Sequence, residues 1–396
     1  MSDSRPQIRL KPREHKRVVQ GHPWIYSNEL VMDQAAKALP PGSLVTVLRD
    51  DGGAIGTAMF NPHTLIAARM LDERRDAPID ADWFGARLAR ALHLRAKLFD
   101  EPYYRLVHAE ADGLPGLVID RYGDVLVVAL NTAGMAALAP AIEAALVALL
   151  QPRALLYAAD SAARRLEGLE PESRIAFGTL DGPVPVRENG IAYRADLTGG
   201  QKTGWFFDQR DNRRFVAGLA RDAHVLDAYC YTGGFALACA KAGAASVLGL
   251  DRSREALALA EEAARANDVS ALCRFETGEA FETLARFGAD GARFDIVMAD
   301  PPAFAKSRKD IGPALKGYRK LARLCAALTA EGGFFLLASC SHHITADALL
   351  AEARHALHDQ GRKARLIRMA GAAPDHPLHP HLPESAYLKA LVFALD

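Results

Sequence analysis

The chain has 396 residues, half of them hydrophobic, and its 48 Lys and Arg residues balance 48 Asp and Glu residues. This length predicts two or three domains that bury sizeable cores. A net charge of zero argues against a protein that coats nucleic acid non-specifically, although it allows a local basic patch. No apolar run reaches the roughly 18 residues that a membrane span needs. The first residues also lack the apolar core of a signal peptide, so we expect a cytoplasmic protein with no membrane partner.

Five cysteines are present, and an odd number in a chain of this length indicates free thiols. No Cys-x-x-Cys pair occurs, so we expect no structural zinc and no other metal site. Four of the five fit the role of a small hydrophobic residue in a core, because they fall in or next to apolar elements: Cys230, Cys239, Cys273 and Cys325.

Residues 1–75 read as a small β-rich domain. Short apolar runs such as 44–48 and 65–70 alternate with turn signals that contain Gly, Pro, Asn and Asp. The start is basic, with Arg5, Arg9, Lys11, Arg13, Lys16 and Arg17. Together with Trp24 and Tyr26 these side chains offer phosphate contacts and stacking faces for RNA. A solvated charged arm is the alternative interpretation.

Residues 76–190 read as a linker helix and a central α+β domain. Helical spacing of apolar residues covers 82–99, and two strands over 117–130 flank a turn at 122–124. A further helix is predicted over 136–150, and Asn189-Gly190 is the signal of a two-residue hairpin turn.

From about residue 191 to 396 the pattern becomes that of an α/β domain. Strands and helices alternate, which predicts a mainly parallel sheet covered on both faces. The expected strands are 224–229, 246–250, 272–276, 294–299, 334–339, 364–369 and 386–393. The expected helices are 234–243, 253–267, 312–329 and 345–359.

Polar residues follow the strands of this domain in an order that suits a nucleoside-containing cofactor. Asp227 ends the first strand, and Gly233 opens the next helix without a Cβ in the way of a ligand. Asp251 ends the second strand, where a carboxylate can accept hydrogen bonds from ribose hydroxyls. Glu279 follows the third strand and is placed to meet an adenine. A generic nucleotide-binding or purely structural turn is the alternative for the first motif.

The set resembles the cofactor site of S-adenosylmethionine (SAM) methyltransferases, which implies S-adenosylhomocysteine as the product. The glycine fingerprints of NAD-binding and ATP-binding proteins are missing. Asp300-Pro-Pro-Ala-Phe304 lies where a transferred methyl group should emerge, and its carboxylate can hold or relay a proton from a base. The segment 199–213 is expected to form a strand, a loop and a helix that line the cofactor pocket and the target-base site; a helix cap with a salt-bridge cluster is the alternative. The remaining candidate cofactor or substrate contacts are Tyr229, Thr232, Arg252, Lys202, Phe206, Asp208, Gln209 and Arg210.

Cys340 is the candidate nucleophile. The C5 atom of a pyrimidine is a poor nucleophile until a thiolate adds to C6 and makes C5 electron-rich. Such a thiol must be accessible and activated beside the methyl donor. Cys340 directly follows the predicted strand 334–339, and His342 or His343 is a candidate for lowering the pKa of its thiol.

These motifs resemble the class I SAM-dependent methyltransferases of large-subunit ribosomal RNA. The resemblance rests on Gly199-Gly-Gln-Lys-Thr-Gly204, Asp227-Ala-Tyr-Cys-Tyr-Thr-Gly-Gly-Phe235, Asp300-Pro-Pro-Ala-Phe304, Ser339-Cys-Ser341, residues 105–124 and the start 10–26. It implies an N-terminal PUA RNA-binding domain, a central α+β domain, a C-terminal Rossmann-like methyltransferase domain and a homodimer that acts on RNA and not on DNA.

The resemblance also implies roles for residues. Asp227, Asp251, Glu279 and Asp300 would contact SAM or frame its pocket, and Cys340 would form the covalent adduct that leads to 5-methylcytosine in 23S rRNA. Two alternatives stay open. One is a methyltransferase for an exocyclic amine, such as guanine N2, that uses Asp300-Pro-Pro. The other is a non-catalytic, SAM-responsive RNA-binding or ribosome-assembly factor.

Overall fold

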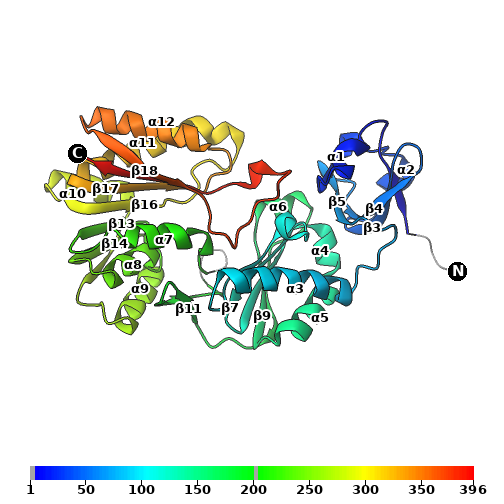
Figure 1. The fold of residues 1–396 in the computed structure, drawn as a ribbon, viewed down its shortest axis with the longest axis horizontal. Coiled ribbons are helices and arrows are strands. Elements are labelled where there is room, and N and C mark those ends of the chain that lie inside the picture. Colours follow the sequence, from blue (N-terminus) through cyan, green and yellow to red (C-terminus); the bar gives the residue numbers. More distant parts are fainter. Residues whose placement is uncertain (1–4, 200–203) are drawn as a thin grey trace. The chain divides into compact units, whose positions relative to one another are not determined.

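The structure is a computed structural model that describes residues 5–199 and 204–396, apart from the side chains of residues 159 and 162. Lys202 therefore lies outside the described residues. The chain forms two compact units. The first comprises Met1–Gly182, Leu197–Gly204 and Asp375–Pro383, and the second comprises Pro183–Asp196, Trp205–Pro374 and Glu384–Asp396. Each unit is described below by itself (Figure 1).

The first unit begins with a five-stranded sheet in the order β1-β3-β4-β5-β2. Its strands are β1 (Gln7–Arg9), β2 (Trp24–Tyr26), β3 (Ser43–Leu48), β4 (Ala54–Phe60) and β5 (Ile66–Asp72). The short helices α1 (His15–Val19) and α2 (Gln34–Lys37) and the 3-10 turn η1 (Ser27–Glu29) connect them. Val45 and Val47 of β3 are fully buried in the core of this sheet.

A second five-stranded sheet of the first unit has the order β10-β9-β8-β7-β6. Its strands are β6 (Tyr103–His108), β7 (Leu117–Tyr122), β8 (Val125–Leu130), β9 (Ala154–Ala159) and β10 (Glu172–Gly178). The helices are α3 (Ala81–Leu98), α4 (Ala133–Ala137), α5 (Ala139–Leu150) and α6 (Ala162–Leu166), with the 3-10 turn η2 (Ala109–Asp112).

The helix predicted over 136–150 is in fact two helices, α4 and α5, that meet at Leu138. Thr132 caps the first through a hydrogen bond from the backbone N–H of Met135. Pro140 lies in the first turn of the second, where its missing N–H breaks no helical bond. The sequence pattern alone joined these two elements because both present apolar residues at helical spacing.

The second unit contains the predicted Asn189-Gly190 hairpin. The strands β11 (Val184–Glu188) and β12 (Ile191–Ala195) pair antiparallel around it. Both turn residues have positive φ, 53° for Asn189 and 76° for Gly190, as this kind of turn requires. The boundary expected between 190 and 191 falls inside this turn, and both strands belong to the second unit.

The main sheet of the second unit has seven strands in the order β15-β14-β13-β16-β17-β19-β18. They are β13 (His224–Ala228), β14 (Ser246–Asp251), β15 (Cys273–Thr277), β16 (Phe294–Ala299), β17 (Thr329–Ser339), β18 (Ala364–Ala370) and β19 (Lys389–Leu395). Strands β15, β14, β13, β16 and β17 are parallel, and β19 is antiparallel to both of its neighbours. This arrangement confirms the predicted Rossmann-like α/β fold.

Helices cover both faces of this sheet (Figure 1). One face carries α7 (Arg210–Ala217), α8 (Gly234–Lys241) and α9 (Arg254–Ala266). The other carries α10 (Ala280–Ala289), α11 (Ile311–Leu328) and α12 (Ala346–Asp359). The 3-10 turns are η3 (Phe207–Gln209), η4 (Arg308–Asp310) and η5 (Pro383–Ser385). Because the five parallel strands point the same way, the residues that follow them gather at one edge of the sheet.

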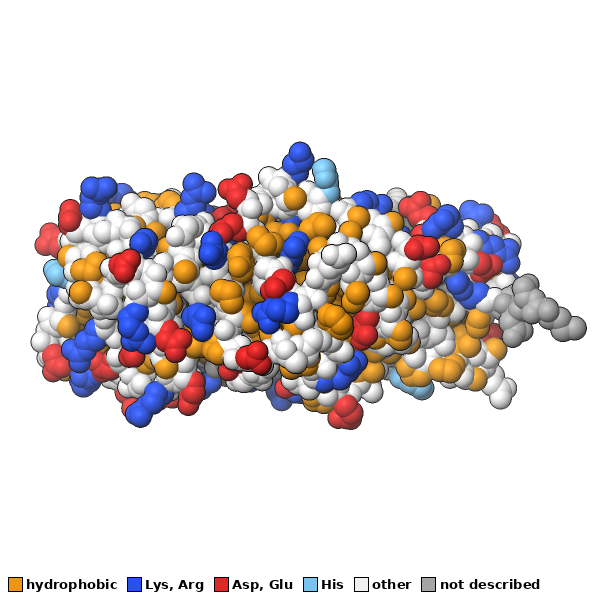
Figure 2. Space-filling model, turned by 90° about the horizontal axis from the view of Figure 1, so that it is seen from below, with side chains coloured by type: hydrophobic (Ala, Val, Ile, Leu, Met, Phe, Trp, Pro, Cys, Tyr) orange, Lys and Arg blue, Asp and Glu red, His pale blue; other side chains and the backbone are white. Residues whose placement is uncertain are grey.

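Among the described residues, no helix is long and apolar enough to cross a bilayer. The face drawn in Figure 2 carries interspersed basic and acidic side chains, in keeping with 48 residues of each charge in the sequence.

Candidate functional site

Two buried side-chain oxygen atoms, one near the end of β13 and one in the turn after it, lack hydrogen-bond partners among the described residues. Asp227 is 1% exposed, and its Oδ2 accepts a bond from the Ala236 N–H at 2.9 Å, but its Oδ1 has no partner. The Oγ1 of the equally buried Thr232 has none either. An unsatisfied buried polar atom costs about 1–3 kcal/mol. Both atoms therefore suit the N–H or O–H groups of a ligand.

The backbone of this turn has an unusual shape. Tyr229 and Tyr231 have positive φ angles of 66° and 51°, which are rare for residues with a side chain, and Gly233 has φ 81°. A Cβ added to Gly233 would make a tight 3.0 Å contact with the Cβ of Ala260, and the positive φ disfavours a larger residue at this position. Tyr231 also meets Phe206 edge to face, with ring centroids 5.5 Å apart.

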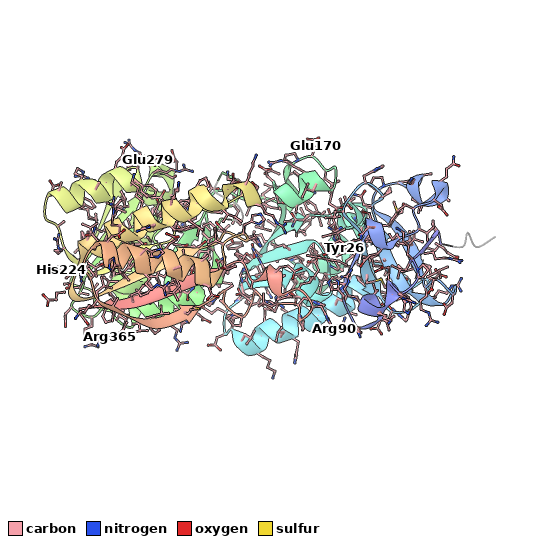
Figure 3. All side chains as sticks on the ribbon, turned by 90° about the horizontal axis from the view of Figure 1, so that it is seen from above. Tyr26, Arg90, Glu170, His224, Glu279 and Arg365 are labelled. Carbon is pink, nitrogen blue, oxygen red and sulfur yellow. The ribbon has the colours of Figure 1, made fainter. Side chains whose placement is uncertain are left out.

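Asp251, at the end of β14, helps to hold this turn. Its Oδ2 accepts a hydrogen bond from the Tyr231 N–H, and its Oδ1 accepts one from the Ser253 N–H, both at 2.9 Å. Each carboxylate oxygen keeps acceptor capacity for a ribose hydroxyl. Arg252 is exposed, and so is Glu279, which precedes α10 at the surface of the unit (Figure 3).

Burial raises the pKa of Asp227 to about 8, and the nearby Asp300 and Asp251 charges act in the same direction. Folded protein therefore holds a proton that the unfolded chain releases near the ordinary pKa of 3.8. Stability must then fall as pH rises through the interval between these values.

We expect Asp227→Asn to remove this pH dependence, since Asn still accepts the Ala236 N–H bond but cannot ionise. In ligand-free protein, the free energy of unfolding of wild type relative to the variant should fall between about pH 5 and pH 8. Urea unfolding at several pH values, followed by circular dichroism, measures it. A difference that stays constant with pH would contradict the burial argument.

The residues just before and at the start of α7 contact the loop after β16. Gln209 donates from Nε2 to Asp300 Oδ2 at 2.8 Å, and Asn212 donates from Nδ2 to Gln209 Oε1 at 2.7 Å. Asp208 accepts a 2.6 Å bond at Oδ2 from the hydroxyl of Tyr387. The structure thus brings the predicted residues Gln209 and Asp300 together and places Asp208 beside the start of β19.

A buried ion pair that the sequence did not predict supports this segment. Glu188 is bound by Arg213 Nε at 2.6 Å and by the indole N–H of Trp205 at 3.2 Å. Arg213 also donates to the carbonyl of Phe206 at 2.6 Å. Arg210, predicted for the cofactor site, adds a second cation whose Nε lies 3.8 Å from Glu188. Residues 205–213 are therefore held by one buried carboxylate at the end of β11.

Strand register places the candidate nucleophile at the same edge of the sheet as the turn after β13. Ala228 of β13 pairs with Ala299 of β16, and Ala299 pairs with Leu337 of β17. Asp300 directly follows β16, and Cys340 directly follows β17. The chain thus brings Asp227, Asp300 and Cys340 to neighbouring positions across three adjacent strands.

Both serines next to Cys340 are fixed by one tyrosine. Ser339 donates to the Tyr318 hydroxyl at 2.8 Å, and this hydroxyl lies 3.1 Å from Ser341 Oγ. Ser341 Oγ also accepts a 3.3 Å bond from the N–H of Ala305, in the loop after Asp300-Pro-Pro. Cys340 itself is half-buried. The thiol therefore sits on a backbone that is anchored on both sides.

The other four thiols are poor candidates for a nucleophile, because burial raises the pKa of each of them: Cys230, Cys239, Cys273 and Cys325. The pKa of the half-buried Cys273 rises to about 11. Cys239 in α8 and Cys325 in α11 are fully buried, which confirms their packing role. All five cysteines are free thiols.

Sequence reasoning missed Lys389, the first residue of β19. It pairs across the strands with Ser339, and its Nζ donates to the carbonyls of Ser341 at 2.6 Å and Tyr387 at 2.7 Å. Burial lowers its pKa to about 8, while the charge of Cys340 acts in the opposite direction. A single lysine next to the otherwise apolar run 390–395 was the signal in the sequence that could have indicated a buried cation.

The histidines considered for activating the thiol both lie on the surface. His342 and His343 are exposed, and the ring of His342 lies 5.3 Å from that of Tyr387. Lys389 is buried, and its charge interacts with that of Cys340.

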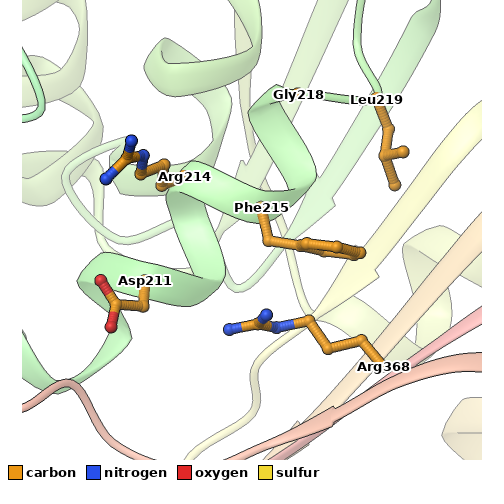
Figure 4. A pocket seen from close by; sticks show the side chains of 6 residues that line it. All are labelled: Asp211, Arg214, Phe215, Gly218, Leu219 and Arg368. Carbon is orange, nitrogen blue, oxygen red and sulfur yellow. The ribbon is translucent and has the colours of Figure 1, made fainter.

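A groove of about 600 Å³ beside α7 is a separate feature. Its lining residues are Asp211, Arg214, Phe215, Gly218, Leu219 and Arg368 (Figure 4). The guanidinium of Arg368 lies over the ring of Phe215, 4.7 Å from its centroid. None of the predicted cofactor residues lines this groove, so we do not place the cofactor in it.

The basic start of the chain divides into exposed and internally bound side chains. Arg17 is bound to Glu29 at 2.7 Å and lies over the ring of Tyr26, and the indole N–H of Trp24 donates to Glu110 at 2.8 Å. The cations that remain exposed are Arg9, Lys11, Arg13 and Lys16.

Comparison with known proteins shows the family to which the chain belongs. Residues 130–394 match the S-adenosylmethionine-dependent methyltransferase family. The chain belongs to this family. It is therefore a SAM-dependent methyltransferase, and residues 8–73 match a PUA-like domain, as predicted.

Two curated relatives extend the match to almost the whole chain. Both are named ribosomal RNA large subunit methyltransferase I. The one from Shewanella denitrificans is 34% identical and the one from Shewanella frigidimarina 35% identical, each over 391 residues that cover 98% of this chain and 98% of the relative.

Solved structures agree on the fold. A protein crystallised in complex with SAH and described as a methyltransferase has a TM-score of 0.83 at 20% identity. A SAM-dependent methyltransferase from Streptococcus mutans has a TM-score of 0.81 at 20% identity. Each match covers 98% of this chain and 100% of the other.

The residues of this methyltransferase fit SAM. The orphaned oxygens of Asp227 and Thr232 offer free hydrogen-bonding capacity, and Asp251 keeps acceptor capacity at its carboxylate. Among the described residues, no group of three His, Cys, Asp or Glu side chains could hold a metal ion.

Proposed function

We propose that this methyltransferase forms 5-methylcytosine in 23S rRNA through a covalent adduct of Cys340. The observation that carries the proposal is the position of Cys340, one residue beyond β17 and beside the loop that begins with Asp300. The curated relatives named for large-subunit ribosomal RNA support the choice of substrate. Cytosine, in preference to uracil, rests on the family resemblance, because thiol addition serves both bases.

Carbon methylation gives the thiol a defined task. SAM supplies an electrophilic methyl group, and Cys340 must make the target carbon able to attack it. The sulfur lone pair forms a bond to C6 of the pyrimidine, and the C5–C6 electron pair becomes available at C5. After methylation a base removes the C5 proton, and the C6–S bond breaks to release the thiolate.

Other residues at this edge of the sheet would bind SAM and orient the target base. We assign Asp227, Thr232 and Gly233 to the amino-acid end of SAM, Asp251 to its ribose and Glu279 to its adenine. The ring of Phe206, set against Tyr231, would border the same pocket. Tyr229 and Arg252 flank the turn and complete the set. Asp300, fixed by Gln209 at 2.8 Å, would orient the target base or hold its proton.

The exposed cations of the PUA-like domain would contact RNA phosphates. We expect the double variant Arg13→Glu/Lys16→Glu to bind 23S rRNA about tenfold more weakly and to show a shallower salt dependence, by about one unit of slope per lost contact. Filter binding across a salt series measures both. Arg274→Glu is a matched control, since this arginine is 81% exposed near the amino end of β15. Equal affinities for the two variants would contradict this placement.

The family resemblance also implies a homodimer, and we propose this assembly for the chain. Sedimentation equilibrium of the purified protein tests it, with the mass of two 42.7 kDa chains expected. A single-chain mass would reject the dimer without affecting the proposed reaction.

The reaction is tested by transfer of radiolabelled methyl groups from SAM to purified, unmodified 23S rRNA, followed by nucleoside analysis. Wild type should place label in 5-methylcytosine, and Cys340→Ala should place none there. Label in a methylated guanine amine, or label that survives the substitution, would contradict carbon methylation and favour an amine reaction at Asp300-Pro-Pro.

A further inference from the structure

The structure contains a buried cation whose partners point to the nucleophile. Lys389 is 7% exposed and lies at the start of β19, opposite Ser339 at the end of β17. An ammonium group in such a place is costly unless it is hydrogen-bonded and near an opposite charge. Two carbonyls, those of Ser341 and Tyr387, accept from it at 2.6 Å and 2.7 Å.

These carbonyls place the ammonium beside Cys340. Ser341 is the next residue after the cysteine, and Ser339, the preceding one, opposes Lys389 in the strand pairing. The charges of Lys389 and Cys340 interact, with the thiolate favouring the protonated amine. By reciprocity the ammonium must favour the thiolate. Carbonyl oxygens carry no full charge, so the cysteine is the group that can neutralise the buried cation.

Within the part of the chain that the structure describes, the remaining titratable groups around the thiol do not supply another cation at this depth. Tyr318, from α11, donates or accepts through its hydroxyl at both flanking serines, and its pKa is raised by burial. Tyr387 gives its hydroxyl proton to a bond with Asp208. His342 is exposed, with its ring against that of Tyr387. Asp300 is bound to Gln209 and adds negative charge to the edge.

We propose that Lys389 is a positioning residue that keeps Cys340 as a thiolate and fixes the backbone on which it attacks. The S–H proton of Cys340 passes to solvent, the sulfur keeps its electron pair, and the ammonium of Lys389 stays protonated beside it. The relevance of this thiolate to methyl transfer rests on the proposed function. The ionisation of the thiol does not depend on the proposed function, so the thiolate proposal and the proposed reaction can fail separately.

Alkylation of Cys340 by iodoacetamide tests the proposal without RNA and without methyl transfer, because only the thiolate reacts. The rate is followed against pH by mass spectrometry of the peptide that contains Cys340. In wild type the midpoint should lie below the ordinary thiol value of about 8.5. In Lys389→Met it should rise by about one pH unit or more, and Lys389→Arg should restore most of the shift.

Two controls separate charge from structure. Tyr387→Phe removes a neighbouring hydroxyl and its bond to Asp208 but leaves the ammonium, so the alkylation midpoint should not move. Stabilisation of each variant by SAH confirms that the second unit is folded. An unchanged midpoint in a folded Lys389→Met variant overturns the proposal.

A wild-type midpoint at or above about 8.5 overturns it as well, even if no lysine variant folds. If the midpoint depends on Lys389 but Cys340→Ala still methylates RNA, the thiolate is real and the proposed carbon chemistry is wrong.

Discussion

Cys340→Ser should lower methyl transfer to RNA by roughly 10³-fold or more, while the affinity for SAH stays within about twofold of wild type. A serine hydroxyl is a far weaker nucleophile than a thiolate at neutral pH, and it lies in a position that Lys389 cannot activate to the same extent. The SAM contacts that we assign to Asp227, Thr232 and Asp251 lie on other strands and are left intact. Transfer of labelled methyl groups measures the rate, and calorimetry measures SAH binding.

A matched control uses another half-buried cysteine of the same sheet. Cys273→Ser alters the first residue of β15, far from the end of β17 in strand order, and should leave methyl transfer nearly unchanged. A tenfold loss of rate corresponds to only about 1.4 kcal/mol of activation barrier. If Cys340→Ser keeps a tenth or more of wild-type activity, Cys340 is not the nucleophile.

Glu188→Ala should destabilise the second unit by about 3–5 kcal/mol. The carboxylate is buried and holds Arg213 at 2.6 Å, with Arg210 3.8 Å away. Its removal leaves buried guanidinium charge without its counter-ion, and the indole N–H of Trp205 loses an acceptor. Because Arg213 also donates to the carbonyl of Phe206, the segment beside the cofactor turn should loosen. Urea unfolding followed by circular dichroism measures the loss of stability.

An exposed ion pair of the same unit provides the comparison. Arg319 and Asp359 lie 2.8 Å apart with side chains 43% and 37% exposed, so Arg319→Ala should cost about 0–1 kcal/mol. Glu188→Gln, which keeps the volume and one acceptor, should fall between the two variants. Equal losses for Glu188→Ala and Arg319→Ala would show that the buried pair does not hold the unit together.

Local patterns in the sequence were sufficient to predict most of the methyltransferase fold. Apolar runs bounded by turn residues located β13, β14, β15 and β16 to within a residue or two. β17 begins at Thr329, five residues before the predicted start at 334. Gly332 and Gly333 are typical turn residues in a sequence, but in the structure they lie within the strand, at a register shift in its pairing with β16. Such a bulge depends on the partner strand, which a local pattern does not show.

Short or polar elements were harder to predict. The helix α10 is missing from the sequence prediction, although it runs from Ala280 to Ala289 between two predicted strands. The direction of β19 was also not predicted. Parallel and antiparallel strands share one side-chain period, so its reversed course becomes visible only in its pairing with β17 and β18.

The same distinction applies to the candidate site. Residues at the ends of strands, such as Asp227, Asp300 and Cys340, could be selected because the edge of a parallel sheet gathers them. Lys389, Tyr318 and Glu188 act through partners that are distant in sequence. The bonds from Lys389 to Ser341 and from Ser339 to Tyr318 span 48 and 21 residues, and no local pattern predicts them.

The central claim is that Cys340 forms a covalent bond to the target pyrimidine during methylation. It is tested most directly with 23S rRNA that contains 5-fluorocytidine, because fluorine at C5 cannot leave as a proton and the adduct persists after methyl transfer. With SAM present, wild type should form a protein–RNA complex that survives denaturation, and digestion should place the cross-link on Cys340. Methyl transfer to unsubstituted 23S rRNA without any adduct to the fluorinated RNA would contradict the account.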